Sequence, residues 1–272
     1  MEEINVHGCI FGDGIPKVCV PLVKTTAAEI IEEARQIEAE AHHLEAMYKH
    51  PELRVSMIEF RADYFDGVAN SAELKELLLK LRKIFADRLI LFTYRSEDEG
   101  GNLRHDRAEG MIDDIYEWVI QSGLVDLIDI ELMSGNFHVV RLTTEAHEHG
   151  IACVVSNHDF TDTPRDDKII SMLRNMEILG ADICKVVSMP ANEFDVRRIT
   201  ELCTKVTRGN LHENNIRKPV VMISMGELGQ ISRISGRETG SAFTFASADT
   251  GLESAPGQLT LENLFQEWNK SL

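Results

Sequence analysis

Two polar residues lie where the sequence is otherwise apolar, and their types indicate covalent chemistry on a carbonyl group. Lys185 lies inside the apolar run 181–188, and His158 directly follows the run 154–157. Burying an ammonium group without a partner is costly, so such a lysine pairs with an acid or loses its proton. A neutral lysine amine can form a Schiff base with a ketone or aldehyde, and histidine can transfer protons near neutral pH. Together they predict Schiff-base chemistry with a general acid/base.

Short apolar runs alternate with amphipathic stretches along the chain. The predicted strands are 17–23, 55–61, 89–94, 127–132, 151–156, 183–187, 220–224 and a weak 241–246. The predicted helices are 26–48, 71–85, 108–122, 136–149, 165–179, 192–207 and 260–268, with Thr26 and Ser71 as N-caps of the first two. Continuously apolar strands are typical of parallel sheets that are buried on both faces.

This alternation predicts an α/β fold, a (β/α)8 TIM barrel that forms a single catalytic domain over residues 1–272. Such barrels typically contain ~250 residues. An open doubly wound sheet is the alternative, but no G-x-G-x-x-G follows the first strand. No linker rich in Pro, Gly or Ser and no low-complexity tract divides the chain.

Composition limits the partners and the compartment. The net charge of −17 argues against nucleic acid as a partner. No apolar run could span a membrane and the N-terminus does not resemble a signal peptide, so we expect a cytoplasmic protein. The five cysteines form no C-x-x-C pair and are expected to be reduced and buried.

Polar residues recur at the carboxyl ends of the predicted strands, which is where barrels carry their active sites. They are Glu59, Arg61 and Asp63 after the second strand, Arg95 and Glu99 after the third, Asp129 and Glu131 in the fourth, His158 and Asp159 after the fifth, Lys185 in the sixth, Met225 after the seventh, and Ser254 and Gln258 after the eighth. With Arg233, the arginines of this set could reverse the overall negative field and favour an anionic organic substrate.

Simpler interpretations exist for several of these residues. Asp129 and Glu131 could be purely structural partners of Arg61 or Lys185, and Lys185 could be a core lysine paired with Glu131. Asp63 and Asp159 are expected to be loop or capping residues. Six other histidines are expected on solvated helix surfaces or loops: His42, His43, His50, His138, His147 and His149.

Metal binding is the competing chemistry, because Glu59, Glu131, His158 and Asp159 could ligate a divalent ion. The nearby cations disfavour it.

Seven segments resemble, in order, those of the type I 3-dehydroquinate dehydratases. They are 59–63 (EFRAD), 92–101 (FTYRSEDEGG), 129–132 (DIEL), 156–160 (SNHDF), 180–185 (GADICK), 224–226 (SMG) with 231–233 (ISR), and 254–258 (SAPGQ). The resemblance runs from about Pro16 to the C-terminal helix. It departs from the family pattern at Phe60, Lys24 and Pro21 and in a longer stretch over 42–56.

The resemblance implies a TIM barrel that dehydrates 3-dehydroquinate to 3-dehydroshikimate, with no metal and no cofactor, often as a homodimer. It also implies a role for each matching residue. Lys185 matches the Schiff-base lysine, His158 matches the acid/base, and Glu99 matches the carboxylate that orients this histidine. The residues that match those holding the substrate hydroxyls and ring are Glu59, Arg61 and Arg95, and Arg233 matches the partner of the substrate carboxylate. Met225 matches an apolar wall, and Ser254 and Gln258 match a mobile loop that closes over the ring.

The sequence leaves two alternative functions open. A class I aldolase also uses a barrel lysine, although its phosphorylated substrates require a phosphate-binding loop for which Gly226 and Gly229 are faint candidates. A barrel that binds an anion without turnover is the non-enzymatic alternative.

Overall fold

A computed structural model describes residues 1–102, 109–209, 211, 216–248 and 254–272. The strands are β1 Ile4–Val6, β2 Cys9–Phe11, β3 Lys17–Leu22, β4 Val55–Arg61, β5 Leu89–Thr93, β6 Leu127–Glu131, β7 Ala152–Asp159, β8 Ile183–Ser188, β9 Val220–Ser224, β10 Phe243–Ser247 and β11 Leu259–Thr260. The helices are α1 Ala27–Tyr48, α2 Ser71–Ile84, α3 Glu109–Ser122, α4 Asn136–Glu148, α5 Asp166–Ile178, α6 Glu193–Thr207, α7 Gln230–Ile234, α8 Gly236–Thr239 and α9 Leu261–Asn269. Three 3-10 turns are η1 Ala62–Tyr64, η2 Glu97–Glu99 and η3 Leu132–Ser134.

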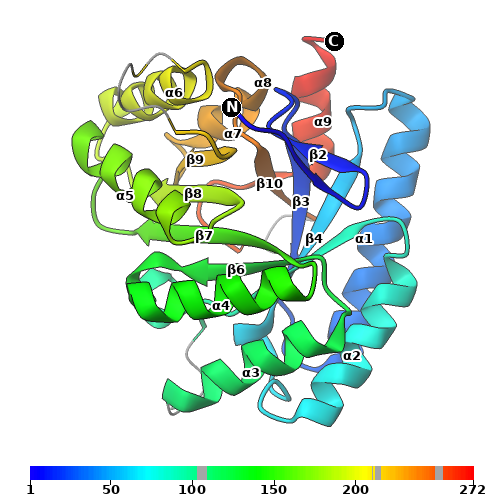
Figure 1. Ribbon diagram of the computed structural model, residues 1–272. Coiled ribbons are helices and arrows are strands. Elements are labelled where there is room, and N and C mark those ends of the chain that lie inside the picture. Colours follow the sequence, from blue (N-terminus) through cyan, green and yellow to red (C-terminus); the bar gives the residue numbers. More distant parts are fainter. Residues whose placement is uncertain (103–108, 210, 212–215, 249–253) are drawn as a thin grey trace.

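The strands β3 to β10 form a parallel sheet that curls into a barrel, with the helices in a ring around it (Figure 1). Their order in the sheet is β10-β3-β4-β5-β6-β7-β8-β9, so neighbours in sequence are neighbours in space. The Ala242 N–H, just before β10, donates to the Val220 carbonyl at the start of β9 at 2.8 Å, which links the two edges. The predicted TIM barrel is confirmed, and the open doubly wound sheet, whose strand order reverses, is excluded.

Several local predictions need correction. The hairpin of β1 and β2 was not predicted, and the short helices α7 and α8 occupy the connection after the seventh barrel strand, where no helix was expected. Thr26 caps α1 as predicted and forms a capping box with Glu29. The N-cap of α2 is Asn70, not Ser71: the Asn70 side chain accepts from two main-chain N–H groups of the first turn.

The apolar core has two parts, inside the barrel and between the strands and helices. The inner part includes Cys19, Met57, Val154 and Ile183 from the strands. Phe11 of the hairpin joins it and packs edge-to-face against Phe243 at the amino end of β10. The hairpin therefore fills the amino end of the barrel, and the carboxyl end is left for polar residues.

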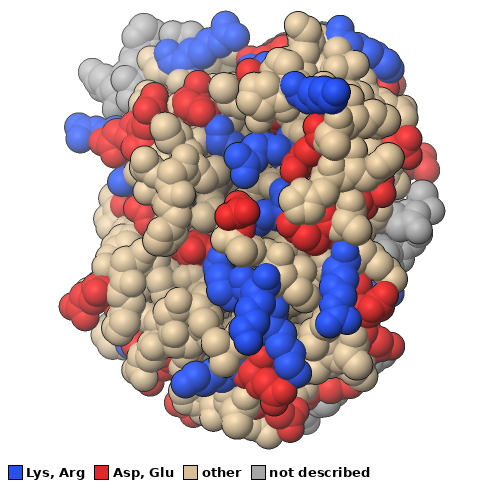
Figure 2. Space-filling view, turned by 90° about the vertical axis from the view of Figure 1, so that its right-hand side faces the viewer, with Lys and Arg blue, Asp and Glu red and all other residues tan. Residues whose placement is uncertain are grey.

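The surface carries an uneven distribution of charge. On the face shown in Figure 2, Lys and Arg side chains gather below the centre and acidic side chains border them, although the chain as a whole has a net charge of −17. Among the described residues, no helix is both long enough and apolar enough to cross a bilayer.

Candidate active site

The carboxyl ends of the barrel strands surround a partly open cavity. Strand β7 continues to Asp159, so His158 is a strand residue, and the register pairs Ser156 with Lys185 on β8. Nine of the ten predicted site residues line this one cavity: Glu59, Arg61, Arg95, Glu99, His158, Lys185, Arg233, Ser254 and Gln258. Parallel strands bring these residues together, although up to 199 positions separate them in the sequence, from Glu59 to Gln258.

Lys185 is buried beside a carboxylate and an aromatic ring. Its Nζ donates to Asp129 Oδ2 at 3.1 Å and lies 4.8 Å from the centre of the Phe245 ring. The acid that pairs with Lys185 is therefore Asp129, one of the two candidates that the sequence offered, and not Glu131. This contact gives the buried Lys185 side chain a carboxylate partner.

Asp129 is fully buried and balances two cations. Its Oδ1 accepts from Arg95 at 2.8 Å and from the Ser156 hydroxyl at 2.6 Å, in addition to the Lys185 contact of Oδ2. Burial by itself would raise the pKa of Asp129, but Arg95 and Lys185 hold it at about 2. Asp129 is thus charged whenever the protein is folded near neutral pH.

Arg95 connects three strand ends through its guanidinium group. Besides Asp129, it donates to Glu131 at 3.1 Å and to Ser156 at 3.0 Å. Despite burial, which alone would lower it, the pKa of Arg95 is raised by the surrounding carboxylates, Asp129 first among them. Glu131 also accepts the Ser96 main-chain N–H at 2.8 Å, so it positions the loop that follows β5.

Glu99 and His158 form a buried pair at the cavity wall. Glu99 Oε2 lies 2.8 Å from His158 Nδ1 and also accepts the His158 main-chain N–H at 3.0 Å. Burial, with the charge of Glu131, raises the pKa of Glu99 to about 8. Burial, with Arg95 and Lys185 nearby, lowers the pKa of His158 well below its usual range. Both shifts oppose an ion pair and favour a neutral imidazole.

The loop that carries Glu99 is folded tightly against β5. The Gly101 N–H donates to the Ser96 carbonyl at 2.7 Å, and a Cβ on Gly101 would lie 1.9 Å from the Arg95 carbonyl oxygen. Only glycine allows this close approach. The turn brings Glu99 back over the barrel mouth to His158.

Arg61 and Glu59 at the end of β4 are each held by a neighbouring polar side chain. Arg61 donates through two nitrogens to the buried Asp63 carboxylate at 2.9 and 2.8 Å. Asp63 lies in a turn, as predicted, but it is an ion-pair partner and also accepts the Arg95 main-chain N–H. Glu59 accepts from the Thr93 hydroxyl at 3.0 Å.

Arg233 differs from the other cavity cations because the described part of the chain gives it no acidic partner. Its side chain is 1% exposed, its Nε has no hydrogen-bond partner among the described residues, and its only bond is to the Pro256 carbonyl at 3.4 Å. Burial lowers the pKa of Arg233 to about 10. A buried, uncompensated guanidinium at a cavity wall is suited to a ligand carboxylate.

Ser254 and Gln258 lie on a short loop that packs over the cavity. The Gln258 amide donates to the Ser254 hydroxyl at 2.9 Å and accepts the Ser254 main-chain N–H at 3.1 Å. The Gly226 N–H donates to the Pro256 carbonyl at 3.0 Å, and a Cβ on Gly257 would lie 2.1 Å from the Gly226 oxygen. The loop is therefore docked against the residues that follow β9.

Met225 is the exception among the predicted site residues. It is fully buried in the inner core and does not line the cavity, because its position just after β9 directs it into the barrel packing. The apolar walls are formed by Phe160, Val187, Ile223 and Phe245, which the sequence reasoning missed. A period-two pattern through β10, with Phe243 and Phe245 on one face, was the available signal for Phe245.

The four residues proposed as metal ligands do not form a ligand group in the described structure. Glu131 bonds to Arg95, and Asp159, the last residue of β7, accepts from the Thr161 N–H and hydroxyl and so caps the turn that follows, in line with the predicted capping role. The cavity instead combines one lysine, one neutral histidine and one free arginine, a set that suits covalent chemistry on an anionic carbonyl compound.

Comparisons with known proteins agree with this chemistry. The family model described as Type I 3-dehydroquinase matches residues 18–269. The 3-dehydroquinate dehydratase of Clostridium novyi is 36% identical over 264 residues, which cover 97% of this chain and 96% of the relative. That of Bacillus subtilis is also 36% identical over 264 residues, with 97% and 95% covered.

Solved structures give the same result. The type I 3-dehydroquinate dehydratase of Clostridium difficile, crystallised with covalently modified comenic acid, superposes with a TM-score of 0.83 at 33% identity, over 100% of this chain and 99% of that one. The 3-dehydroquinate dehydratase of Geobacillus kaustophilus superposes with a TM-score of 0.87 at 29% identity, over 99% and 96%.

Proposed function

Because the chain belongs to the type I 3-dehydroquinase family, we propose that Lys185 is the nucleophile of its Schiff-base reaction and His158 its acid/base. The protein is a 3-dehydroquinate dehydratase, a lyase of the shikimate pathway that leads to chorismate and the aromatic amino acids. The substrate is 3-dehydroquinate, and the product after loss of one water is 3-dehydroshikimate. Family membership removes the aldolase and the inert anion-binding barrel as rivals.

The observation that carries the residue roles is the placement of Lys185 and the neutral His158 on one cavity. Lys185 gives up its proton and attacks the C3 ketone, and loss of water from the adduct leaves an iminium. His158 then takes the C2 proton, and the electron pair of the broken C2–H bond flows into the iminium to form an enamine. The enamine expels the C1 hydroxyl, which leaves as water with a proton from His158. Hydrolysis of the new iminium frees Lys185.

Asp129 supports the cationic stages of this sequence. Its charged carboxylate lies 3.1 Å from the nitrogen that becomes the iminium. A fixed negative charge at this distance stabilises the iminium and so keeps it protonated as an electron sink. Only an unprotonated amine attacks a ketone, so a proton on Lys185 must move to another group before attack, and the neutral imidazole of His158 faces the same cavity.

The remaining cavity residues bind and enclose the substrate. Arg233 pairs with the substrate carboxylate through its uncompensated guanidinium, while Glu59, Arg61 and Arg95 hold the hydroxyls and the ring. Ser254 and Gln258 close the mouth over the bound ring. No cofactor or metal enters this scheme, because the lysine supplies the electron sink.

The test is reductive trapping. The protein is incubated with 3-dehydroquinate, reduced with borohydride, digested and examined by mass spectrometry. We expect a reduced adduct on the peptide that contains Lys185, and its absence would falsify covalent catalysis at this residue. His158→Ala should abolish turnover and still give the adduct. A folded variant that forms no adduct would show that His158 is misassigned.

We further propose that residues 1–272 form a single domain and that the chain acts as a homodimer. Met133, Phe137 and Ile178 are 72%, 85% and 79% exposed, and Met133 and Ile178 border one groove. Exposed apolar patches of this kind favour association. Light scattering should give the mass of two chains and, for Phe137→Asp, the mass of one. An unchanged mass of the variant would reject this surface.

We also propose that the protein works in the cytoplasm. All five cysteines are free, as expected of a protein in a reducing compartment.

A further inference from the structure

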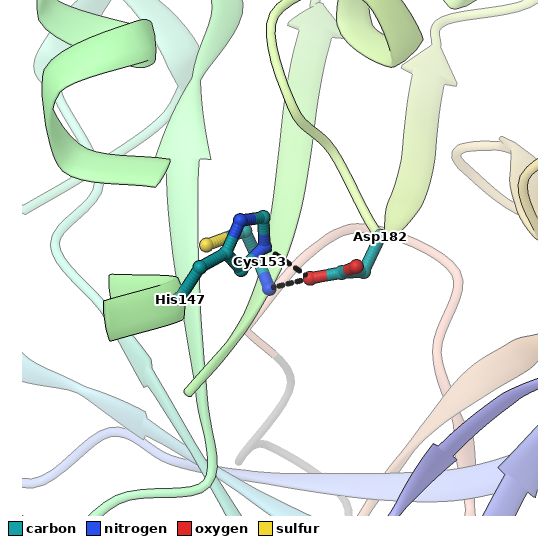
Figure 3. A group of neighbouring side chains, drawn as sticks. All are labelled: His147, Cys153 and Asp182. Atoms are coloured by element: carbon teal, nitrogen blue, oxygen red, sulfur yellow. Dashed lines mark hydrogen bonds and ion pairs between the residues drawn. The ribbon is translucent and has the colours of Figure 1, made fainter. Parts of the chain in front are cut away.

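A second group of reactive side chains lies at the opposite end of the barrel from the cavity. His147 is in the last turn of α4, Cys153 is near the start of β7, and Asp182 directly precedes β8 (Figure 3). A His147 ring nitrogen, the Cys153 sulfur and an Asp182 oxygen all lie within 4.8 Å of one another. Because these positions are at the amino ends of the strands, the group has no part in the dehydration.

We propose that His147, Cys153 and Asp182 form a zinc-binding site. Their donors are one imidazole nitrogen, one sulfur and one carboxylate oxygen, a set that suits the borderline-soft Zn²⁺ and does not suit Mg²⁺ or Ca²⁺, which take oxygen donors. Among the described residues, this is the one group of three or more such side chains close enough to share an ion.

The geometry requires only a small adjustment. Tetrahedral zinc with bonds of about 2.0 to 2.3 Å places its ligand atoms roughly 3.3 to 3.7 Å apart. His147 Nε2 and Asp182 Oδ2 are 2.8 Å apart in a hydrogen bond, so they must separate by roughly 0.5 Å to take the ion between them. The Cys153 sulfur must approach by roughly 1 Å, and the imidazole, on a side chain that is 44% exposed, can move to meet it.

Asp182 is already held in position for this role. Its Oδ2 accepts the Cys153 main-chain N–H at 2.8 Å, which fixes the carboxylate next to the thiol-bearing residue. His147 lies exposed on the surface of α4, as expected, and its ring also pairs with Asp182. The exposure of His147 leaves solvent access for a water as the fourth ligand.

Zinc binding would join three segments of the fold. The ion replaces the thiol proton of Cys153, which leaves to solvent, and bridges α4, β7 and the segment before β8. Because zinc would bind the folded chain through preformed neighbours, it should raise the melting temperature by mass action. Lys218 is a positive charge close enough to influence His147, and it opposes the ion.

The experiment uses the full chain after removal of metals by a chelator, with Zn²⁺ alone as the probe. We expect one equivalent to bind in competition with a chromophoric chelator, together with a higher melting temperature. Co²⁺ in place of Zn²⁺ should give a thiolate-to-cobalt charge-transfer absorption. His147→Gln should weaken zinc binding more than roughly tenfold. Cys153→Ser should also abolish the cobalt absorption. Lys218→Ala should tighten binding.

Matched controls distinguish this site from adventitious binding. Cys9→Ser removes a more accessible cysteine, and His149→Gln removes an exposed histidine two residues from His147. Both should bind zinc as the unchanged chain does. The proposal would be overturned if the unchanged chain did not bind zinc, or if His147→Gln bound zinc equally well. If Cys153→Ser does not fold, the result for His147→Gln decides alone. Dehydratase activity should be unaffected in the His147 variant, so the test is independent of the proposed catalytic residues.

Discussion

Asp129 holds Lys185 through one carboxylate oxygen and Arg95 through the other, at 3.1 and 2.8 Å. One buried anion therefore sets the charge balance of two cations that the reaction uses in different ways. In the proposed mechanism Lys185 changes its bonding in every turnover, whereas Arg95 keeps its guanidinium throughout. This shared partner makes the stability of the fold and the chemistry of the lysine interdependent.

Removing the charge of Asp129 should destabilise the protein. In Asp129→Asn the two buried cations lose their common partner, and we expect the free energy of unfolding to fall by about 3 to 5 kcal/mol. Urea denaturation measures this. Asp167→Asn, on an exposed side chain of α5, is the matched control and should change stability by less than about 0.5 kcal/mol. Equal values for the two variants would contradict the charge balance described here.

Asp129 should also affect how the free energy of unfolding changes at acidic pH. The folded-state pKa of Asp129 is about 2, below its ordinary value of 3.8. A lowered carboxyl pKa contributes stability that is fully present above the ordinary value and is lost as the pH falls through the folded value. Stability measured between pH 5 and pH 2 should therefore fall less steeply in Asp129→Asn than in the unchanged chain.

The pair of Glu99 and His158 predicts an alkaline rise in activity. The pKa of Glu99 is about 8, so we expect the carboxyl to keep its proton near neutral pH and, in that state, to donate a hydrogen bond to His158 Nδ1, which lies 2.8 Å away. Ionised Glu99 instead accepts a hydrogen bond from Nδ1–H, which leaves Nε2 unprotonated and able to act as a base. We expect kcat/KM to increase as the pH rises through about 8. Glu99→Gln should remove this limb, and an identical pH profile for the variant would reject the assignment.

Replacing Arg233 with an apolar residue should stabilise the fold and weaken substrate binding. Its guanidinium is buried without an acid, and one pKa unit corresponds to ~1.4 kcal/mol, so Arg233→Met should raise the free energy of unfolding by about 1 to 3 kcal/mol. The same change removes the partner of the substrate carboxylate, and KM should rise more than roughly tenfold. Arg165→Met, on an exposed side chain, should do neither. A destabilised variant with normal KM would contradict both expectations.

Gly257 tests the docking of the loop over the cavity. A Cβ there would meet the Gly226 oxygen at 2.1 Å, so Gly257→Ala must displace the loop that carries Ser254 and Gln258. We expect KM to rise several-fold. Gly123→Ala is the matched control, because Gly123 also has a positive φ but no atom within 4 Å of the added carbon. Both should lose roughly 1 kcal/mol of stability through backbone strain, and only the first should alter KM.

The sequence allowed prediction of the parts that depend on strand periodicity. Lys185 and His158 stand out because each interrupts an apolar run, and parallel strands must bring such interruptions to one rim. The partner of Lys185 could not be chosen between Asp129 and Glu131, since the two lie two residues apart on the same face of β6 and only the barrel's curvature decides which reaches across. Met225 was misplaced for a related reason: the direction of a side chain just beyond a strand end depends on the local backbone.

The hairpin of β1 and β2 at the amino end of the barrel restricts where substrate and product can enter and leave. Because Phe11 packs against Phe243, the barrel is closed at its amino end. Substrate and product therefore share the opening beside the loop of Ser254 and Gln258. In the proposed mechanism, the water expelled in the dehydration is released into the same enclosed space in which the lysine adduct awaits hydrolysis. One molecule of water could therefore serve as leaving group and then as reagent within a single closure of the loop.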